Sequence, residues 1–132
     1  MILSRACEYA IQAVLYLARQ KNDSYISIKV IADKNDISFH FLGKILQKLT
    51  QKGILTSYKG PRGGVCLAKS AHQITPWDIV AAIDGLDFCR KCVVGFPECN
   101  EQNPCDLHYK WAHIRQNICD MLSEKSIAEL ID

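Results

Sequence analysis

Four of the seven cysteines in this chain lie within 17 residues, between Cys89 and Cys105. The stretch around them, from Asp84 to Asp106, shows neither helical nor strand periodicity, and its glycines and prolines predict a loop. A loop of this length needs something to hold it in shape. In a reducing compartment, clustered thiols are typical of metal binding or redox chemistry rather than of structural disulfides. The loop therefore predicts a thiol-based site.

The segment before this loop is predicted to hold three helices in close succession. From Ser4 to Gln20, and again after Ser38, apolar residues follow the spacing of an amphipathic helix. Between them, Ser27 is a suitable N-cap for a short second helix, and 34–36 is read as a tight turn. Gly53 suits the end of the third helix. Two short helices joined by a tight turn are typical of a helix-turn-helix.

Two β-prone runs, 54–58 and 65–68, follow the third helix directly. Between them lies Lys59-Gly60-Pro61-Arg62-Gly63-Gly64, whose glycines and proline favour a turn. A β-hairpin at this place is the wing of a winged helix-turn-helix, a DNA-binding fold.

Basic side chains gather on the third helix and the wing. Residues 38–62 contain five lysines or arginines and no acid. An isolated run of this kind is usually a solvated helix face, but here it coincides with a helix-turn-helix and a basic wing, which favours double-stranded DNA as the partner. We predict base-edge contacts from Ser38, His40 and Lys44, phosphate contacts from Lys48 and Lys59, and entry of Arg62 into a minor groove or its rim. For His40, an ordinary surface histidine is an equally open interpretation.

Helical signals return on both sides of the cysteine-rich loop. Thr75 and Pro76 open a fourth helix, which ends before Gly85. After the loop, apolar residues recur at heptad spacing, at Leu107, Trp111, Ile114, Ile118 and Met121. Such a seam either packs on its own domain or pairs with a second copy of the chain. Pairing fits a protein that reads a two-part operator, so we expect a homodimer.

Three thiols in the loop, Cys92, Cys99 and Cys105, are followed just beyond it by the imidazole of His108. Iron–sulphur clusters are held mainly by thiolates, and histidine can replace a cysteine at an iron. Three thiolates leave one position for a weaker, exchangeable ligand, which suits a sensor of oxygen or nitric oxide. We therefore predict an iron–sulphur cluster at these residues.

The extra thiol of Cys89 keeps two other interpretations open. Four cysteines can bind a structural zinc ion, although the spacings after Cys92 do not form the second CxxC of a zinc ribbon. Cys89 and Cys92 can also form a thiol–disulfide switch or the centre of a redox enzyme, but the thioredoxin-like context is missing. Because the chain also lacks a Ser-His-Asp set, a P-loop and a dinucleotide fingerprint, we predict that it is not an enzyme. We interpret Cys7, Cys66 and Cys119 as small buried hydrophobic side chains.

Four segments carry a resemblance to a known family: Glu8-Tyr9-Ala10, Ile37-Ser38-Phe39-His40-Phe41-Leu42, Gly60-Pro61-Arg62-Gly63-Gly64, and Cys105-Asp-Leu-His108 with Trp111 beyond. Through them the whole chain resembles the Rrf-type (IscR/NsrR-like) family of bacterial winged helix-turn-helix iron–sulphur transcription regulators. The resemblance implies a homodimer with crossed C-terminal helices, a 2Fe–2S or 4Fe–4S cluster, and repression or activation that changes with the state of the cluster. Of the two, we expect repression.

The resemblance also implies which residues hold the cluster. Cys92, Cys99 and Cys105 match the ligating cysteines, and His108 matches the histidine that completes the cluster in one branch. Glu8 lies where other members place a carboxylate ligand from the partner subunit. The chain departs from the pattern by six residues, instead of five, between the first two cysteines and by the extra Cys89. These departures leave the cluster type and the fourth ligand open.

The expected organisation follows from these assignments. The fold class is mainly α, a winged helix-turn-helix DNA-binding domain with a long C-terminal dimerisation helix. Residues 1–84 form the DNA-binding domain, residues 85–106 the cysteine-rich cluster-binding loop, and residues 107–132 the dimerisation helix and C-terminal tail. Charges interrupt the apolar start of the chain, and no segment approaches the ~18 uncharged residues of a membrane span. We therefore expect a cytoplasmic protein with no membrane partner.

Overall fold

The computed structural model describes residues 2–20 and 24–132. Its elements, in chain order, are α1 (Arg5–Arg19), α2 (Ile28–Asn35), α3 (Phe39–Gln51), β1 (Leu55–Tyr58), β2 (Gly64–Leu67), the 3-10 helix η1 (Ala71–Gln73), α4 (Pro76–Ile83), the 3-10 helix η2 (Asp87–Cys89), α5 (His108–Ser123) and α6 (Ile127–Ile131). Helices dominate, and the two strands form one antiparallel hairpin. The predicted fold class is confirmed. In the described part of the chain, no helix is both long and apolar enough to cross a membrane.

Side-chain caps fix where the helices begin, as the sequence predicted. The hydroxyl oxygens of Ser27 and Ser38 accept hydrogen bonds from the backbone N–H groups of Val30 and Phe41. Thr75 forms a reciprocal capping box with Asp78, and Pro76 occupies the first turn of α4. These caps satisfy N–H groups that would otherwise lack a partner at the helix ends.

The turn between α2 and α3 is shorter than predicted. Lys34 and Asn35 continue α2, and the chain reverses only at Asp36, whose φ of 53° is left-handed. Asn35 remains helical while its side-chain amide donates to the carbonyl oxygen of Ile31 over 2.8 Å. The prediction of a turn over residues 34–36 was therefore wrong for its first two residues.

One main core holds the winged helix-turn-helix together. Its fully buried side chains come from α1, α2, α3, α4, α6, the hairpin and the segment between η1 and α4. They include Val14, Ile31, Leu42, Leu46, Leu49, Leu55, Ile74, Ile79 and Ile127. Burying a side chain of this size stabilises the fold by roughly 1.5–3 kcal/mol. The last helix, α6, belongs to this core, because Ile127 is buried and its N–H donates to the carbonyl oxygen of Ile74 over 2.7 Å.

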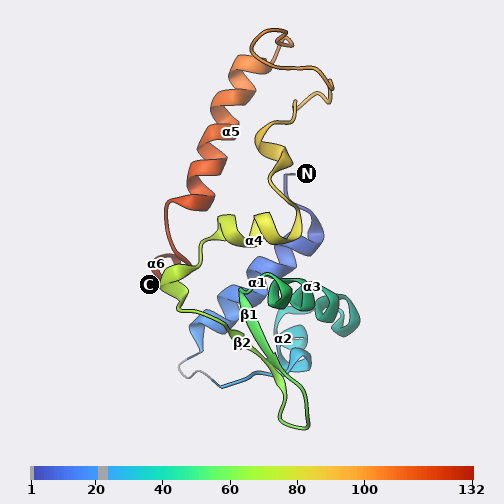
Figure 1. Ribbon diagram of the computed structural model, residues 1–132, viewed down its shortest axis with the longest axis vertical. Coiled ribbons are helices and arrows are strands. Elements are labelled where there is room, and N and C mark those ends of the chain that lie inside the picture. Colours follow the sequence, from blue (N-terminus) through green and yellow to red (C-terminus); the bar gives the residue numbers. More distant parts are fainter. Residues whose placement is uncertain (1, 21–23) are drawn as a thin grey trace.

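A second, smaller core fixes the cysteine-rich segment onto the body of the protein. We call residues 85–107 the cysteine arm. At its base, Cys7 of α1, Val80 of α4 and Leu122 of α5 are buried together, with Phe88 of η2 and Ile118 of α5 packed against them. Figure 1 shows the arm and the tip of the β1–β2 hairpin at opposite ends of the molecule, with α5 running back from the arm to the body.

Candidate metal centre and nucleic-acid interface

Three thiols meet in the cysteine arm. The Sγ atoms of Cys92, Cys99 and Cys105 all lie within 4.8 Å of one another, and those of Cys92 and Cys105 are 3.4 Å apart. Each of the three side chains is partly buried. We call this group the cysteine triad. Residues thirteen positions apart in a loop without regular structure thus meet at one point.

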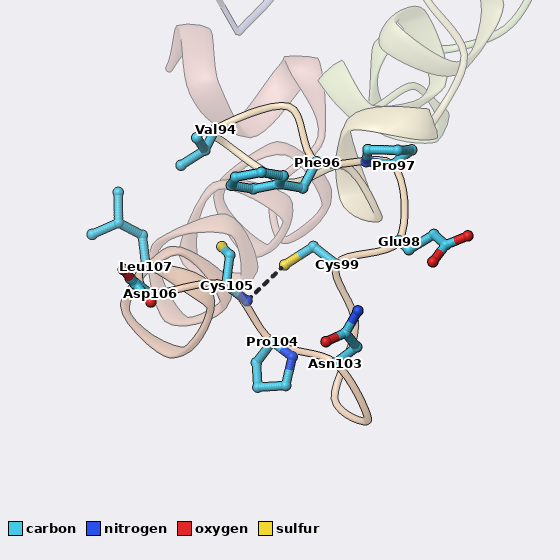
Figure 2. A pocket seen from close by; sticks show the side chains of 10 residues that line it. All are labelled: Val94, Phe96, Pro97, Glu98, Cys99, Asn103, Pro104, Cys105, Asp106 and Leu107. Carbon is cyan, nitrogen blue, oxygen red and sulfur yellow. Dashed lines mark hydrogen bonds between the residues drawn. The ribbon is translucent and has the colours of Figure 1, made fainter.

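Local hydrogen bonds shape the loop between these thiols. The side-chain oxygen of Asn100 accepts from the N–H groups of Gln102 and Asn103, over 2.9 and 2.8 Å, and closes a tight turn. This turn brings Cys105 back to Cys99, so that the N–H of Cys105 donates to the Cys99 sulphur over 3.4 Å (Figure 2). Backbone N–H groups directed at sulphur are a common feature of thiolate sites, because they stabilise the negative charge.

The surroundings of the triad favour a thiolate at one of its members. Desolvation raises the pKa of Cys92, but hydrogen bonds from the backbone N–H groups of Phe96 and Val94 outweigh it and lower the pKa to about 7. For Cys105, the hydrogen bond with Cys99 and then desolvation raise the pKa to about 11. The thiolate is the form of cysteine that binds metals. Metal binding here is therefore helped by the lowered pKa of Cys92 and has to displace the proton of Cys105.

The three candidates for a fourth ligand differ in their positions relative to the triad. His108 is buried at the start of α5, and its Nδ1 lies 3.4 Å from the Cys99 sulphur. It is next to the triad, although it is outside the group whose ligand atoms are all within 4.8 Å. Glu8 is exposed on α1. The Cys89 sulphur lies 3.2 Å from that of Cys119, outside the triad.

A cavity of about 630 Å³ opens beside the triad. Its apolar rim includes Val94, Phe96 and Leu107, each about half exposed to solvent. Figure 2 shows the side chains that line it: Val94, Phe96, Pro97, Glu98, Cys99, Asn103, Pro104, Cys105, Asp106 and Leu107. Soft thiolate donors beside such a space fit an iron–sulphur cluster or zinc, whereas magnesium and calcium prefer oxygen ligands.

Contrary to the expectation from the sequence, Cys7, Cys66 and Cys119 are not all buried. Cys7 is fully buried, and burial, followed by the charge of Asp84, raises its pKa to about 12. Cys66 and Cys119, however, are partly exposed, so that prediction was wrong for both. The contact between Cys89 and Cys119 was also missed, because no motif links two cysteines that are 30 residues apart.

All six predicted DNA-contact residues lie on the surface. Ser38, His40, Lys44 and Lys48 are exposed on α3 or at its cap, and Lys59 and Arg62 are exposed in the hairpin turn. The opposite face of α3 is apolar and buried in the main core. The exposed face of α3 therefore carries polar and basic side chains that a ligand can contact.

Two aromatic side chains on α3 were not singled out from the sequence. Phe39 and Phe41 are 49% and 40% exposed, beside His40. Their rings make edge contacts, Phe39 with His40 at 5.5 Å and Phe41 with Tyr9 of α1 at 5.6 Å between ring centroids. Large exposed apolar side chains next to a basic helix face are suited to contact the methyl groups of thymine.

The wing is fixed to the rest of the domain by backbone pairing. Ile26 and Val65 exchange two hydrogen bonds of 2.9 Å, which joins the segment before α2 to strand β2. Gly64 allows this close approach, because a Cβ there would overlap the backbone of Ile26. The wing therefore has a defined position relative to α2 and α3.

Comparison with known proteins agrees with this arrangement. The family model "Rrf2", described as an iron-dependent transcriptional regulator, matches residues 3–132. A protein of Aquifex aeolicus, whose name places it among HTH-type transcriptional regulators, is 35% identical over 134 residues, covering 100% of this chain and 92% of that protein. The HTH-type transcriptional regulator IscR of Erwinia tasmaniensis is 28% identical over 132 residues, covering 100% of this chain and 79% of that protein.

The fold also matches a solved structure. CymR, the global cysteine regulator of B. subtilis, superposes with a TM-score of 0.80 at 24% identity, covering 97% of this chain and 94% of CymR. At this identity the likeness concerns the fold alone. Because the matching proteins are transcriptional regulators, the prediction that this chain is not an enzyme is confirmed.

Proposed function

The chain belongs to the Rrf2 family of transcriptional regulators, and on this basis we propose that it controls transcription through a cysteine-ligated iron–sulphur cluster. In this proposal a cytoplasmic homodimer binds a double-stranded operator as a repressor. Iron–sulphur status, redox state or nitric oxide then changes its affinity for DNA. The observation that carries the proposal is the meeting of three thiols within 4.8 Å in a relative of IscR.

The triad supplies the first three ligands in this proposal. Cys92, Cys99 and Cys105 would hold a 2Fe–2S or 4Fe–4S cluster, which when bound supplies an iron centre that responds to oxidants and nitric oxide. His108 is the fourth ligand we favour, because it lies beside Cys99 and is already buried. Glu8 of the partner subunit is the alternative. Cys89 is disfavoured, because its sulphur contacts that of Cys119.

Helix α1 contacts both the base of the arm and the DNA-binding helix α3. Cys7 of α1 is buried with Leu122 of α5 at the base of the arm. Two residues further along α1, Tyr9 contacts Phe41 of α3. We therefore expect a change in the arm to move α3 through α1.

The surface of α5 supports the homodimer. On the predicted heptad seam, Leu107, Ile114 and Met121 are 48%, 51% and 62% exposed. Apolar side chains repeated along one helix at this exposure favour pairing with the same helix of a second copy. Two copies would then present two α3 helices to the two halves of an operator.

For the DNA contacts we propose the assignment expected from the sequence. The N-terminal half of α3, with Ser38, His40 and Lys44, would read base edges. Lys48 and Lys59 would bind phosphates, and Arg62 at the tip of the wing would enter a minor groove or its rim. The hydroxyl of Ser38 already accepts from the N–H of Phe41, so it would offer DNA its O–H as a donor.

Structural zinc is the second candidate for the same site. The triad and the adjacent His108 together make the three-cysteine, one-histidine set that binds zinc tetrahedrally. A regulator with zinc here would keep its DNA binding. It would contain no iron–sulphur cluster through which nitric oxide or oxygen could change that binding.

Replacement of one ligand tests the proposal. We expect Cys92→Ala to lose the visible absorbance of the protein and to change its affinity for genomic DNA fragments that the unaltered protein binds. Cys66→Ala, a cysteine outside the arm, is the matched control and is expected to keep both properties. A Cys92→Ala protein with unaltered spectrum and DNA binding would remove the sensor from the proposal.

A further inference from the structure

A second pair of sulphurs lies at the base of the cysteine arm, away from the triad. The Sγ atoms of Cys89, at the end of η2, and Cys119, in the last turns of α5, are 3.2 Å apart. The two residues are 30 positions apart in the chain, and each is partly exposed. A disulfide has an S–S bond of about 2.05 Å, so the two sulphurs need to approach by only about 1 Å.

The elements that carry the two thiols are already held together. Phe88, the neighbour of Cys89, and Ile118, the neighbour of Cys119, both pack on the small core formed by Cys7, Val80 and Leu122. The contact between the two sulphurs therefore does not depend on the loop beyond η2. Neither thiol belongs to the set of possible metal ligands formed by the triad.

We infer that Cys89 and Cys119 form a reversible disulfide within one chain, a modification site separate from the metal centre. The oxidant is a peroxide, and the reductant that restores the thiols is a dithiol. One sulphur attacks a peroxide oxygen, the O–O bond breaks, and a sulphenic acid and one water form. The second sulphur then attacks the sulphenic sulphur, a second water leaves, and the S–S bond forms. Two thiols lose two electrons and two protons, and one hydrogen peroxide becomes two waters.

The disulfide would close a covalent ring that contains the whole triad and His108. It would join η2, near the start of the arm, to the last turns of α5 whether or not the triad holds a metal. Cross-linking restricts the freedom of the enclosed segment. The protein would then have two sites of oxidation, one at the triad and one at the base of the arm. Each could be oxidised without the other.

Peptide mapping tests this directly, because trypsin separates the relevant cysteines. Cleavage after lysine and arginine places Cys89 in peptide 70–90, the triad in peptide 92–110 and Cys119 in peptide 116–125. The full-length protein is freed of metal with a chelator, treated with hydrogen peroxide, blocked with N-ethylmaleimide and digested without reductant. We expect peptide 70–90 linked to peptide 116–125, and release of both by dithiothreitol. A link from 70–90 to 92–110, or both cysteines alkylated, would overturn the inference.

Two variants make the assignment specific. A triple variant, Cys92→Ser with Cys99→Ser and Cys105→Ser, retains four thiols, and we expect peroxide to lower the free thiols from four to two. Cys66→Ser is the matched control and should keep the 70–90 to 116–125 link. Mixing ¹⁵N-labelled and unlabelled protein identifies links between chains, and hybrid masses for this peptide pair would contradict a bond within one chain.

A third variant tests whether the two sites are separate. Cys89→Ser is expected to abolish the link while retaining the iron content and absorbance of the unaltered protein. Loss of iron from Cys89→Ser would instead make Cys89 a ligand and would contradict a separate site.

Discussion

The indole nitrogen of Trp111 donates a hydrogen bond of 2.8 Å to the carbonyl oxygen of Lys91, across 20 residues. Lys91 immediately precedes Cys92, the first thiol of the triad. Arg115, one turn further along α5, also points its guanidinium at this oxygen, at 3.5 Å. The first turns of α5 therefore fix the backbone from which Cys92 projects.

Removal of this donor should loosen the metal centre. Trp111→Phe keeps an aromatic ring but loses the indole N–H, which costs about 1 kcal/mol or about a fivefold change in an equilibrium. We expect iron to be lost to a chelator several-fold faster, as measured by the decrease in visible absorbance. Tyr109→Phe, on an exposed neighbour in α5, is the control. Equal rates in Trp111→Phe and the unaltered protein would show that this bond does not position Cys92.

The basic residues of the DNA-binding face should control the salt dependence of binding. When a lysine that binds one phosphate is removed, the slope of log K against log salt decreases in magnitude by about 0.9. We expect this reduction for Lys48→Ala and for Lys59→Ala, measured by fluorescence anisotropy with duplex DNA. Lys69→Ala, an exposed lysine after the hairpin, should keep the slope. An unchanged slope in the first two variants would place the DNA on another face.

The wing should depend on the absence of a side chain at Gly64. Its φ is +159°, and a Cβ would overlap the backbone of Ile26 and lie 2.8 Å from the nitrogen of Ser27. We expect Gly64→Ala to lower the free energy of unfolding by about 2 kcal/mol or more, measured by urea denaturation. Gly43→Ala is the control, because a Cβ there meets nothing within 4 Å and alanine favours the helix. Equal stability of the two variants would contradict the close approach of β2 to Ile26.

A charge on the seam of α5 should separate the proposed dimer. Ile114 is 51% exposed, so Ile114→Glu should leave the fold of each chain intact. We expect sedimentation analysis to report a dimer for the unaltered protein and a monomer for Ile114→Glu, because burying an unpaired carboxylate is costly. Gln116→Glu adds the same charge off the seam and should remain dimeric. If Ile114→Glu remains a dimer, the interface lies on a surface other than this seam.

Most of the fold could be predicted because its signals are local. A serine or threonine ahead of an apolar repeat marked the starts of α2, α3 and α4, and all three caps were confirmed. Gly53 after α3 has the expected positive φ of 80°. The wing followed from a glycine-rich turn between two β-prone runs, and its strands lie within one residue of the expected bounds.

The features that were missed depend on tertiary contacts. Cys89 lies near Cys92 in the sequence, and that spacing suggested a local pair, but packing of η2 on α5 brings its sulphur to Cys119. The second core explains this, because Phe88 and Ile118, the neighbours of the two cysteines, both pack against it. The triad was predicted as a group, but spacing alone gave no means to choose a fourth ligand. The position of the fourth ligand depends on where α5 begins in the case of His108, and on a partner subunit in the case of Glu8.

The central claim is that the triad holds iron together with inorganic sulphide. The most direct measurement is the metal and acid-labile sulphide content of the full-length protein purified without oxygen. We predict a coloured protein with iron and sulphide in equal amounts, both absent from Cys92→Ala. A colourless protein that contains zinc and no sulphide would contradict the claim.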